Sequence, residues 1–267
     1  MRRYLDVILP SILISIAEAL YFTGNPEACL AVHGLNVLVC ILLPLALIGW
    51  DTMLFQAFSL VSLIRLVGLG MPVFFSLTLY NFIPVYAVAI VGAFVVLGEG
   101  RAFAEQIGAV KDTFIGIFRK MRGSLGLWAV FLLIGISLGY LFSNIEYAII
   151  RPEALVPQLD LFYMLVLGFI MLFFVGFGEE LMFRALLQRK LQGRIGVWAG
   201  IILTSVLFAA MHSVYFSYAY LVYVFIVGMI IGVAYYRTKS LGFVALIHGS
   251  INFFLFSFLP YGYIGLF

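Results

Sequence analysis

The sequence predicts an all-α protein, a polytopic transmembrane helical bundle of about nine spans (eight or nine). Of its 267 residues, 65% are hydrophobic and only 10% are charged, and the mean hydropathy is +1.18. Soluble domains carry about 25% charged residues, so this composition indicates an integral membrane protein. Apolar stretches of about 20 residues, enough for one helix to cross a bilayer, recur along the chain.

The expected spans follow one another with short polar connectors between them. They lie near residues 7–23, 31–50, 53–76, 82–98, 124–143, 161–187, 196–213, 217–236 and 241–260. No small-residue cleavage site follows the first apolar residues before Glu18, so we expect a retained span rather than a signal peptide. Only Asp51 separates the second span from the third, where Arg65 precedes two glycines and Pro72. That pattern also fits a broken or re-entrant helix.

Basic residues in the connectors predict the orientation in the membrane. They form clusters that alternating spans place on one side: Arg2/Arg3, the stretch 101–122, Arg189/Lys190/Arg194 and Arg237/Lys239. By the positive-inside rule this side is cytoplasmic, so we expect a cytoplasmic N-terminus and a C-terminus on the opposite side. The opposite connectors carry Glu27 and the acidic run from Glu146 to Asp160. The net charge of +3 comes from these clusters, so we expect a lipid bilayer, and no nucleic acid, as partner.

The long polar stretch between Arg101 and Gly123 has apolar residues at helical spacing. This pattern is typical of an amphipathic helix on the cytoplasmic surface, and we favour a connector over a partner-docking helix. It divides the chain into residues 1–123, a transmembrane region of unknown role, and residues 124–267. The cysteines Cys29 and Cys40 show no metal-binding or redox spacing, so we expect small apolar fillers.

Charged side chains inside spans are informative, because each costs at least about 2.5 kcal/mol at a helix centre unless it is paired or hydrated. In the first half these are Glu18, His33 and Arg65. Glu18 and His33 lie near predicted span ends, where snorkelling lowers the cost. Arg65 either pairs with a carboxylate such as Glu18 or lies at a helix break. We interpret all three as structural.

Three spans of the second half carry polar residues of a different kind. They are Glu179, Glu180 and Arg184 in the sixth span, His212 in the seventh, and His248 and Asn252 in the ninth. At about 100° per residue, Glu180 and Arg184 share one helix face and can form an ion pair. Glu179 points away from that arginine. Since a carboxylate bound to arginine is a poor base, Glu179 is the candidate general base.

The two histidines of these spans have partners at the same i,i+4 spacing. His248 and Asn252 share one face and can both donate hydrogen bonds to one point, as an oxyanion hole requires. The Phe208 ring is expected to pack behind the His212 imidazole and to limit its rotamers. Counted along straight helices from a turn near Gly193, Glu179 lies ~21 Å deep and His212 ~28 Å deep. We therefore expect tilt or an irregular turn to bring the two to one level.

Either motif alone has a structural interpretation. Glu180 and Arg184 can be a buried salt bridge that specifies helix packing. His248 and Asn252 can form hydrogen bonds that hold neighbouring helices together. Four polar residues from three spans at comparable depths are better explained by a catalytic site, since ionisable groups within membranes mark function.

Three motifs in successive spans carry a family resemblance: EELMFR (179–184), FAAMH (208–212) and HGSIN (248–252). They resemble the EExxxR, FxxxH and HxxxN/B motifs of the CPBP intramembrane protease family. That family includes the type II CAAX prenyl endopeptidases and bacterial relatives linked to abortive infection and bacteriocin self-immunity. The resemblance covers residues 161–259 and implies that 124–267 form a protease core of the CPBP type. Residues 1–123 resemble no family.

The resemblance implies cleavage of a peptide bond near the C-terminus of a prenylated (CAAX-type) or other membrane-bound peptide. Glu179 and His212 would activate a water, and His248 and Asn252 would stabilise the oxyanion. The residues that would support the site are Glu180, Arg184 and Phe208. The cavity they line is expected to open toward the cytoplasm or laterally to lipid.

No metal or other cofactor is expected, because a Glu/His pair can activate water without one. A divalent metal such as zinc is the alternative, since Glu and His are ordinary zinc ligands. Against zinc, the chain has no HExxH spacing, and Asn is an uncommon zinc ligand. Two other functional classes stay open: a non-catalytic immunity or scaffold protein, and a proton- or ion-coupled transporter with polar groups along a route.

Overall fold

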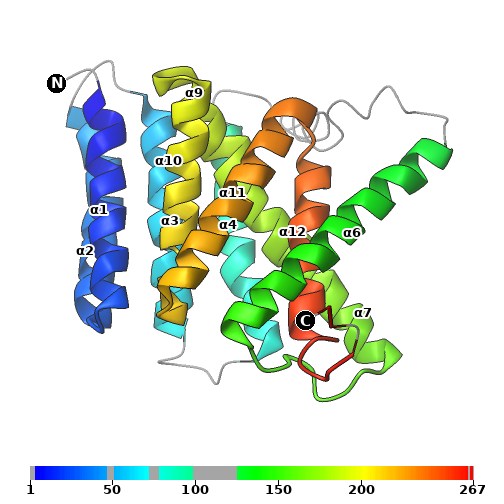
Figure 1. Cartoon of the computed structure of the whole chain (residues 1–267). Coiled ribbons are helices and arrows are strands. Elements are labelled where there is room, and N and C mark those ends of the chain that lie inside the picture. The colour runs from blue at the N-terminus through cyan, green and yellow to red at the C-terminus, as the bar shows by residue number, and fades with distance from the viewer. Residues whose placement is uncertain (1–3, 47–50, 72–77, 99–124, 264, 267) are drawn as a thin grey trace.

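The computed structural model describes residues 4–46, 51–71, 78–98, 125–263 and 265–266. Within these ranges the chain is helical and has no strand, and eight helices are long and apolar enough to cross a membrane. With one shorter apolar helix, Leu241–Phe256, they form the polytopic bundle of about nine spans that the sequence predicts (Figure 1). The amphipathic helix expected between Arg101 and Gly123 lies outside the described residues.

The first half of the chain supplies four spans. They are α1 (Leu5–Phe22), α2 (Pro26–Ala46), α3 (Thr52–Gly70) and α4 (Phe82–Leu97), the last preceded by the 3-10 turn η3 (Leu79–Asn81). Asp51 caps the start of α3, where its carboxylate accepts a hydrogen bond from the Leu54 amide at 3.1 Å. α3 then continues unbroken through Arg65 to Gly70, so the described part of the third span is a regular helix, and Pro72 lies outside the described residues.

The second half supplies the spans that carry the three motifs. They are α6 (Leu125–Ile150), one long helix over residues 161–195, α10 (Val197–Ala210), α11 (Tyr218–Thr238) and α12 (Leu241–Phe256). The long helix consists of α7 (Leu161–Phe169), π-helical η5 (Ile170–Gly176), α8 (Phe177–Glu180), π-helical η6 (Leu181–Gln188) and α9 (Arg189–Ile195). The turn η7 (Ser213–Tyr215) follows α10.

Glu146 does not lie in a connector, contrary to the expectation. α6 continues to Ile150, and Glu146 is buried within it at 6% exposure. The Tyr220 hydroxyl of α11 donates a hydrogen bond to its carboxylate at 2.5 Å. This bond lowers the cost of burying a carboxyl group in a span.

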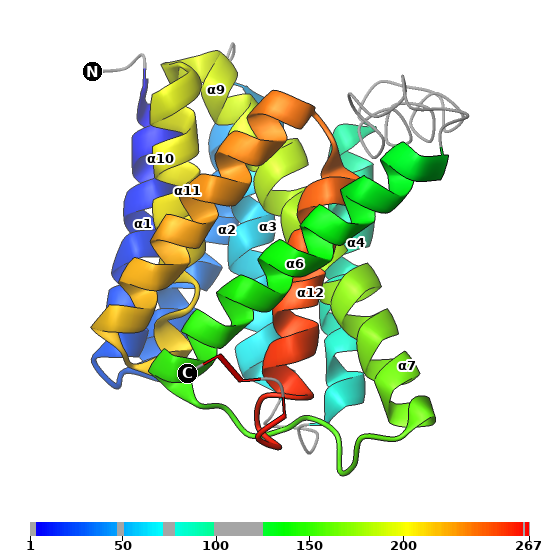
Figure 2. The same cartoon turned by 45° about the vertical axis from the view of Figure 1, so that its right-hand side comes forward.

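α12 lies in the interior of the bundle. Figures 1 and 2 show it between the oblique α6 and the long 161–195 helix, and it packs against both α6 and η5. On another side of the long helix, α4 contacts η5, α8 and η6. Elsewhere in the bundle, α1 contacts α10 and η7. Helices of the first half therefore pack directly on the segments that hold the motif residues.

Two glycines permit the close approach of η5 and α12. A Cβ atom at Gly176 would lie 2.7 Å from the Gly249 nitrogen, and a Cβ atom at Gly249 would lie 2.8 Å from the Cα atom of Leu172. Real Cβ atoms are not found at such distances, so only glycine allows the two backbones to touch here. This contact brings Glu179 and Glu180 beside His248, the residue before Gly249.

The outer surface of the bundle is apolar, as a bilayer requires. Leu45, Val95, Leu133, Leu161 and Leu165 each expose more than 60% of their surface. In a soluble protein so much exposed apolar surface would favour aggregation. Cys29 and Cys40 are buried free thiols, which agrees with their predicted role as small apolar fillers.

The two ends of the bundle differ in charge. The end at the top of Figure 1 holds α9 and the α11–α12 connector, whose basic residues are Arg189, Lys190, Arg194, Arg237 and Lys239. The connectors α1–α2, α6–α7 and α10–α11 lie at the other end and carry one Lys or Arg, Arg151, among the residues that the structure describes. The chain is a multi-pass membrane protein, and the cytoplasmic position of the basic end stays a prediction.

Candidate active site

The two motif glutamates occupy a single α-helical turn between two π-helical segments. Glu179 and Glu180 end α8, with η5 before it and η6 after it. A π-helix has more residues per turn than an α-helix, so it rotates the following side chains relative to a regular helix, and such segments are frequent at functional sites. The sequence predicts tilt or an irregular turn, because straight helices would leave Glu179 and His212 at different depths in the membrane. The π-helical segments are irregularities of this kind.

Glu180 and Arg184 form the predicted ion pair. The Arg184 Nε atom donates to Glu180 Oε2 at 2.9 Å, and both side chains are fully buried. Arg184 Nη1 contacts Gln188 Oε1 at 3.4 Å, and the amide of Gln188 donates to the Gly232 carbonyl of α11. The guanidinium also lies over the Phe208 ring, 5.2 Å from its centroid.

Glu180 has a second partner that the sequence did not indicate. Its Oε1 atom lies 2.8 Å from the Nδ1 atom of His248 on α12. A carboxylate can only accept here, so Nδ1 carries the hydrogen and Nε2 is the ring nitrogen left for other contacts. Glu180 therefore fixes the orientation of His248 in addition to neutralising Arg184.

Within the described part of the chain Glu179 has no arginine partner, and other side chains contact it. The hydroxyl of Tyr86 on α4 donates a hydrogen bond to its Oε1 atom. Its Oε2 atom lies 3.7 Å from the Nε2 atom of His248. The His248 ring therefore lies between the two adjacent glutamates, with one nitrogen toward each.

His212 lies just beyond the end of α10. Its Nδ1 atom is 2.8 Å from the Phe208 carbonyl, which can only accept, so Nε2 of the neutral ring keeps its lone pair. The Phe208 ring packs against the imidazole with centroids 4.9 Å apart, as the sequence predicted. It also meets the His248 ring edge-on at 5.7 Å. Phe208 thus separates and supports both histidines.

All four residues proposed for catalysis line one cavity of about 570 Å³: Glu179, His212, His248 and Asn252. Polar groups outside the three motifs also line it, including Arg65, Tyr86, Glu146, Tyr215 and Tyr220. Apolar residues such as Val175 and Met182 make up much of the remaining wall. A mostly apolar cavity with few convergent polar groups is the usual form of a binding site.

The cavity lies toward the end of the bundle that is away from the basic connectors. Its wall includes Thr78, which precedes η3, Leu155 of the α6–α7 connector and Tyr215 of η7. These three segments lie at the lower end in Figure 1. The lining residues thus place the cavity toward the end away from the basic connectors, and its opening, toward the cytoplasm or laterally to lipid, stays a prediction.

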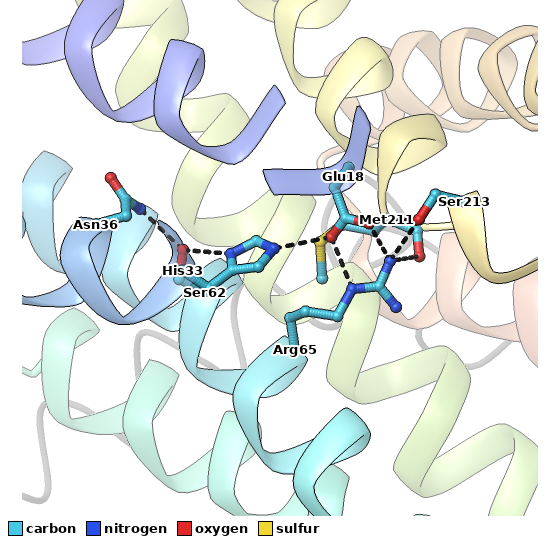
Figure 3. A network of polar contacts seen from close by, with 7 residues as sticks. All are labelled: Glu18, His33, Asn36, Ser62, Arg65, Met211 and Ser213. Atoms are coloured by element: carbon cyan, nitrogen blue, oxygen red, sulfur yellow. Dashed lines mark hydrogen bonds and ion pairs between the residues drawn. The ribbon is translucent and has the colours of Figure 1, made fainter. Parts of the chain in front are cut away.

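Glu18, His33 and Arg65 are buried and joined by hydrogen bonds and ion pairs (Figure 3). The expected pair of Arg65 with Glu18 is present, with Arg65 Nε 2.7 Å from Glu18 Oε1. The expected snorkelling of Glu18 and His33 is wrong, because they are 2% and 0% exposed. His33 Nε2 lies 3.0 Å from Glu18 Oε1, so these groups satisfy one another inside the bundle instead of reaching water.

The sequence did not assign the polar wall residues outside the motifs to the site, among them Tyr86, Arg65 and Glu146. Tyr86 carries no sequence signal, because a tyrosine in an apolar span is ordinary. Arg65 gave a signal, its charge within a span, but it was interpreted as structural. Among the described residues no group of three His, Cys, Asp or Glu side chains could hold a metal ion, and metal independence stays a prediction.

Comparison with known proteins bears on the second half of the chain. No curated protein and no solved structure matches the chain. A family model does match, over residues 161–254, from the start of α7 into α12. This stretch includes all seven motif residues and excludes α1 to α6. Residues 161–254 are thus similar to the family described as type II CAAX prenyl endopeptidase Rce1-like, which supports the resemblance to CPBP intramembrane proteases.

Proposed function

We propose that this protein is an intramembrane endopeptidase that hydrolyses a peptide bond of a membrane-bound peptide. The observation that carries the proposal is the single cavity lined by Glu179, His212, His248 and Asn252, all within the segment that matches the protease family. A carboxylate and an unprotonated imidazole nitrogen can take a proton from water, and an imidazole and a carboxamide can donate to an oxyanion.

The proposed reaction uses a water molecule as the nucleophile. The water oxygen bonds to the scissile carbonyl carbon while Glu179, assisted by His212, takes one water proton. The carbonyl electron pair moves to oxygen, and the resulting oxyanion accepts hydrogen bonds from His248 and Asn252. The carbon–nitrogen bond then breaks, and the leaving nitrogen receives the proton that the water gave up. The products are a carboxyl group and an amine.

The contacts of His248 support its role as a donor. Its Nδ1–H bond to Glu180 places a negative charge beside the ring, and this charge stabilises a doubly protonated imidazole whose Nε2–H can donate into the cavity. The formal charges of Glu179, Glu180, Arg184 and such a His248 then sum to zero. A neutral set is far less costly inside a membrane than a net charge.

The position of the cavity bears on the substrate. If the basic connectors are cytoplasmic, the wall residues Thr78, Leu155 and Tyr215 lie at the non-cytoplasmic end. We therefore favour a transmembrane or leader-like peptide that presents its scissile bond at that end over a prenylated C-terminus in the cytoplasm. Labelling intact cells with a membrane-impermeant maleimide tests this orientation. Glu153→Cys should react and Gly193→Cys should not.

The purified protein in lipid nanodiscs tests the activity itself. It is given an unlipidated transmembrane peptide and a prenylated CAAX peptide, and products are identified by mass spectrometry. We expect cleavage of the transmembrane peptide, loss of cleavage in Glu179→Gln, and normal cleavage in Glu27→Gln, which alters an exposed carboxylate of α2. Cleavage of only the prenylated peptide would overturn the substrate preference and keep the protease.

Two other functions predict different results. A scaffold or immunity protein would cleave neither peptide, and its cellular effect would tolerate Glu179→Gln. A transporter would move protons or ions across proteoliposomes, and flux would depend on the same residues. Flux without cleavage would replace the protease proposal.

A further inference from the structure

His212 lies beyond the last residue of α10, in the turn that leads to η7. α10 ends at Ala210, and His212 is followed by the short turn η7 and by Phe216, which has the left-handed φ of 50°. The Nδ1 contact to Phe208 fixes the ring against the helix, and the Met211 and His212 amides bond to carbonyls of α10. The Met211 carbonyl and the Ser213 hydroxyl have partners outside α10. A general base must keep its position to within a fraction of an ångström.

Those partners come from the first half of the chain (Figure 3). The Arg65 Nη2 atom of α3 donates to the Met211 carbonyl at 2.8 Å and lies 3.1 Å from the Ser213 hydroxyl. Ser213 in turn donates to Glu18 Oε2 of α1 at 2.6 Å. The two residues that flank His212 are therefore both bonded to one buried ion pair.

The ion pair is itself fixed by its surroundings. Arg65 binds both oxygens of Glu18, through Nε and Nη2, and lies over the Tyr21 ring at 5.3 Å. His33 Nε2 also contacts Glu18 Oε1 at 3.0 Å. With Ser213 included, each carboxylate oxygen of Glu18 has two partners. A planar guanidinium in a two-point pair has little freedom left, so it can hold other groups accurately.

The next layer continues into α2 and α3. The Ser62 hydroxyl lies 2.9 Å from His33 Nδ1 and accepts from the Asn36 amide at 2.9 Å. A neutral His33 with its hydrogen on Nε2 satisfies these bonds, because Ser62 then donates to Nδ1 and His33 donates to Glu18. Three helices of the first half thus support one carboxylate.

We propose that Glu18 and Arg65 are positioning residues that clamp Met211, through its carbonyl, and Ser213, through its hydroxyl, on either side of His212. This role rests on the proposed function of His212 as part of the water-activating pair. This gives the first three spans, which lie outside the matched segment, a part in the reaction. Arg65 also lines the cavity. In this proposal it positions the His212 turn and takes no part in the bond changes.

The chain offers a matched control for this clamp. Asp6 and Arg194 also form an ion pair between α1 and the second half, with Arg194 Nε 2.8 Å from Asp6 Oδ2. This pair lies near the start of α1, at the basic end, and neither residue lines the cavity. Removing it weakens a link between the same two halves of the chain without touching the His212 turn.

The test compares Arg65→Gln, Ser213→Ala and Arg194→Gln in nanodiscs. We expect Arg65→Gln to lower kcat at least about tenfold, with KM within about twofold, because misplacing a catalytic group mainly slows the chemical step. Ser213→Ala removes one hydroxyl and is expected to fold, with a smaller fall in kcat. Compared with Arg65→Gln, Arg65→Lys should restore thermal stability more than it restores kcat, since an ammonium group cannot reproduce the two-point hydrogen bonding of a guanidinium.

Hydrogen–deuterium exchange measures the clamp without any activity. We expect faster exchange in residues 211–217 of Arg65→Gln and Ser213→Ala, with no such change in Arg194→Gln. If the wild type cleaves neither peptide, the proposed function fails and this exchange alone decides the clamp. Unchanged exchange, or kcat falling only as much as in Arg194→Gln at equal thermal stability, would overturn it. So would a rise in KM at unchanged kcat, which would make Arg65 a substrate-binding residue.

Discussion

The Nδ1 atom of His248 lies 2.8 Å from the Oε1 atom of Glu180, which places the second glutamate of the motif in contact with the ring proposed to hold the oxyanion as well as with Arg184. Sequence spacing alone gave Glu180 a structural role and Glu179 the chemical one. The contact means that Glu180 has both kinds of role, and this changes what its substitution should do.

Glu180→Gln should therefore harm both stability and activity. It leaves Arg184 as a buried charge without its counter-ion, which costs roughly 3–5 kcal/mol, and it removes the negative charge that holds His248 in its donor form. We expect a lower thermal midpoint and a kcat below that of the wild type even at temperatures where the variant is folded. Glu179→Gln, measured in parallel, should lose activity with little change in thermal midpoint, because its amide oxygen still accepts from Tyr86. Identical behaviour of the two variants in both assays would contradict this division.

Tyr86→Phe should lower activity with little loss of stability. The phenol fixes one oxygen of Glu179 from α4, and without it the carboxylate can adopt other rotamers. A lost hydrogen bond to a charged group corresponds to about 1.5–3 kcal/mol, so we expect a fall of at least about tenfold in kcat. Tyr235→Phe is the control, because Tyr235 is buried in α11 away from the cavity wall. Equal activity of the two variants would show that the Tyr86 hydroxyl does not contribute to activity.

Gly249→Ala should separate η5 from α12. The added methyl would meet the Leu172 Cα atom at 2.8 Å and the Met171 carbonyl at 2.9 Å, and such overpacking costs about 1–3 kcal/mol. We expect a lower thermal midpoint and weak activity, since the glutamates would move away from His248. Gly168→Ala, in the long helix that packs against α12, is the control, because its methyl would meet only the Phe253 ring at 3.6 Å. If Gly249→Ala changed neither the thermal midpoint nor the activity, the contact between η5 and α12 would not position the site.

Removing divalent metals should cost little activity. If Glu179 and His212 polarise the water and His248 with Asn252 hold the oxyanion, fixed protein groups supply all the charge stabilisation. The measurement is the cleavage rate after a membrane-permeant chelator, with elemental analysis of the same sample. Activity lost on chelation, restored by one metal that is bound near stoichiometrically, would establish a metal enzyme. Inhibition by added zinc would not, since excess zinc can bridge the same side chains.

The sequence by itself determined the spans and the contacts that lie within one helix. Composition and apolar length are properties of each segment alone, so the membrane bundle could be predicted. Likewise the pairs Glu180–Arg184 and Phe208–His212 are separated by one helical turn, and a turn has the same geometry wherever its helix lies. Both pairs are present in the structure.

Tertiary structure alone decided the contacts between helices. Neither the Tyr86 bond to Glu179 nor the hold of Arg65 on the His212 turn has a sequence pattern, because residues 93 and 146 positions apart are brought together only by packing. Two glycines at a helix crossing and two π-helical segments set the rotation of the glutamates toward His248. The sequence predicts Glu18 and His33 near span ends, where their side chains could reach water, because a single helix in lipid offers them no partner. Their burial became favourable only when α1, α2 and α3 supplied each polar group with a partner.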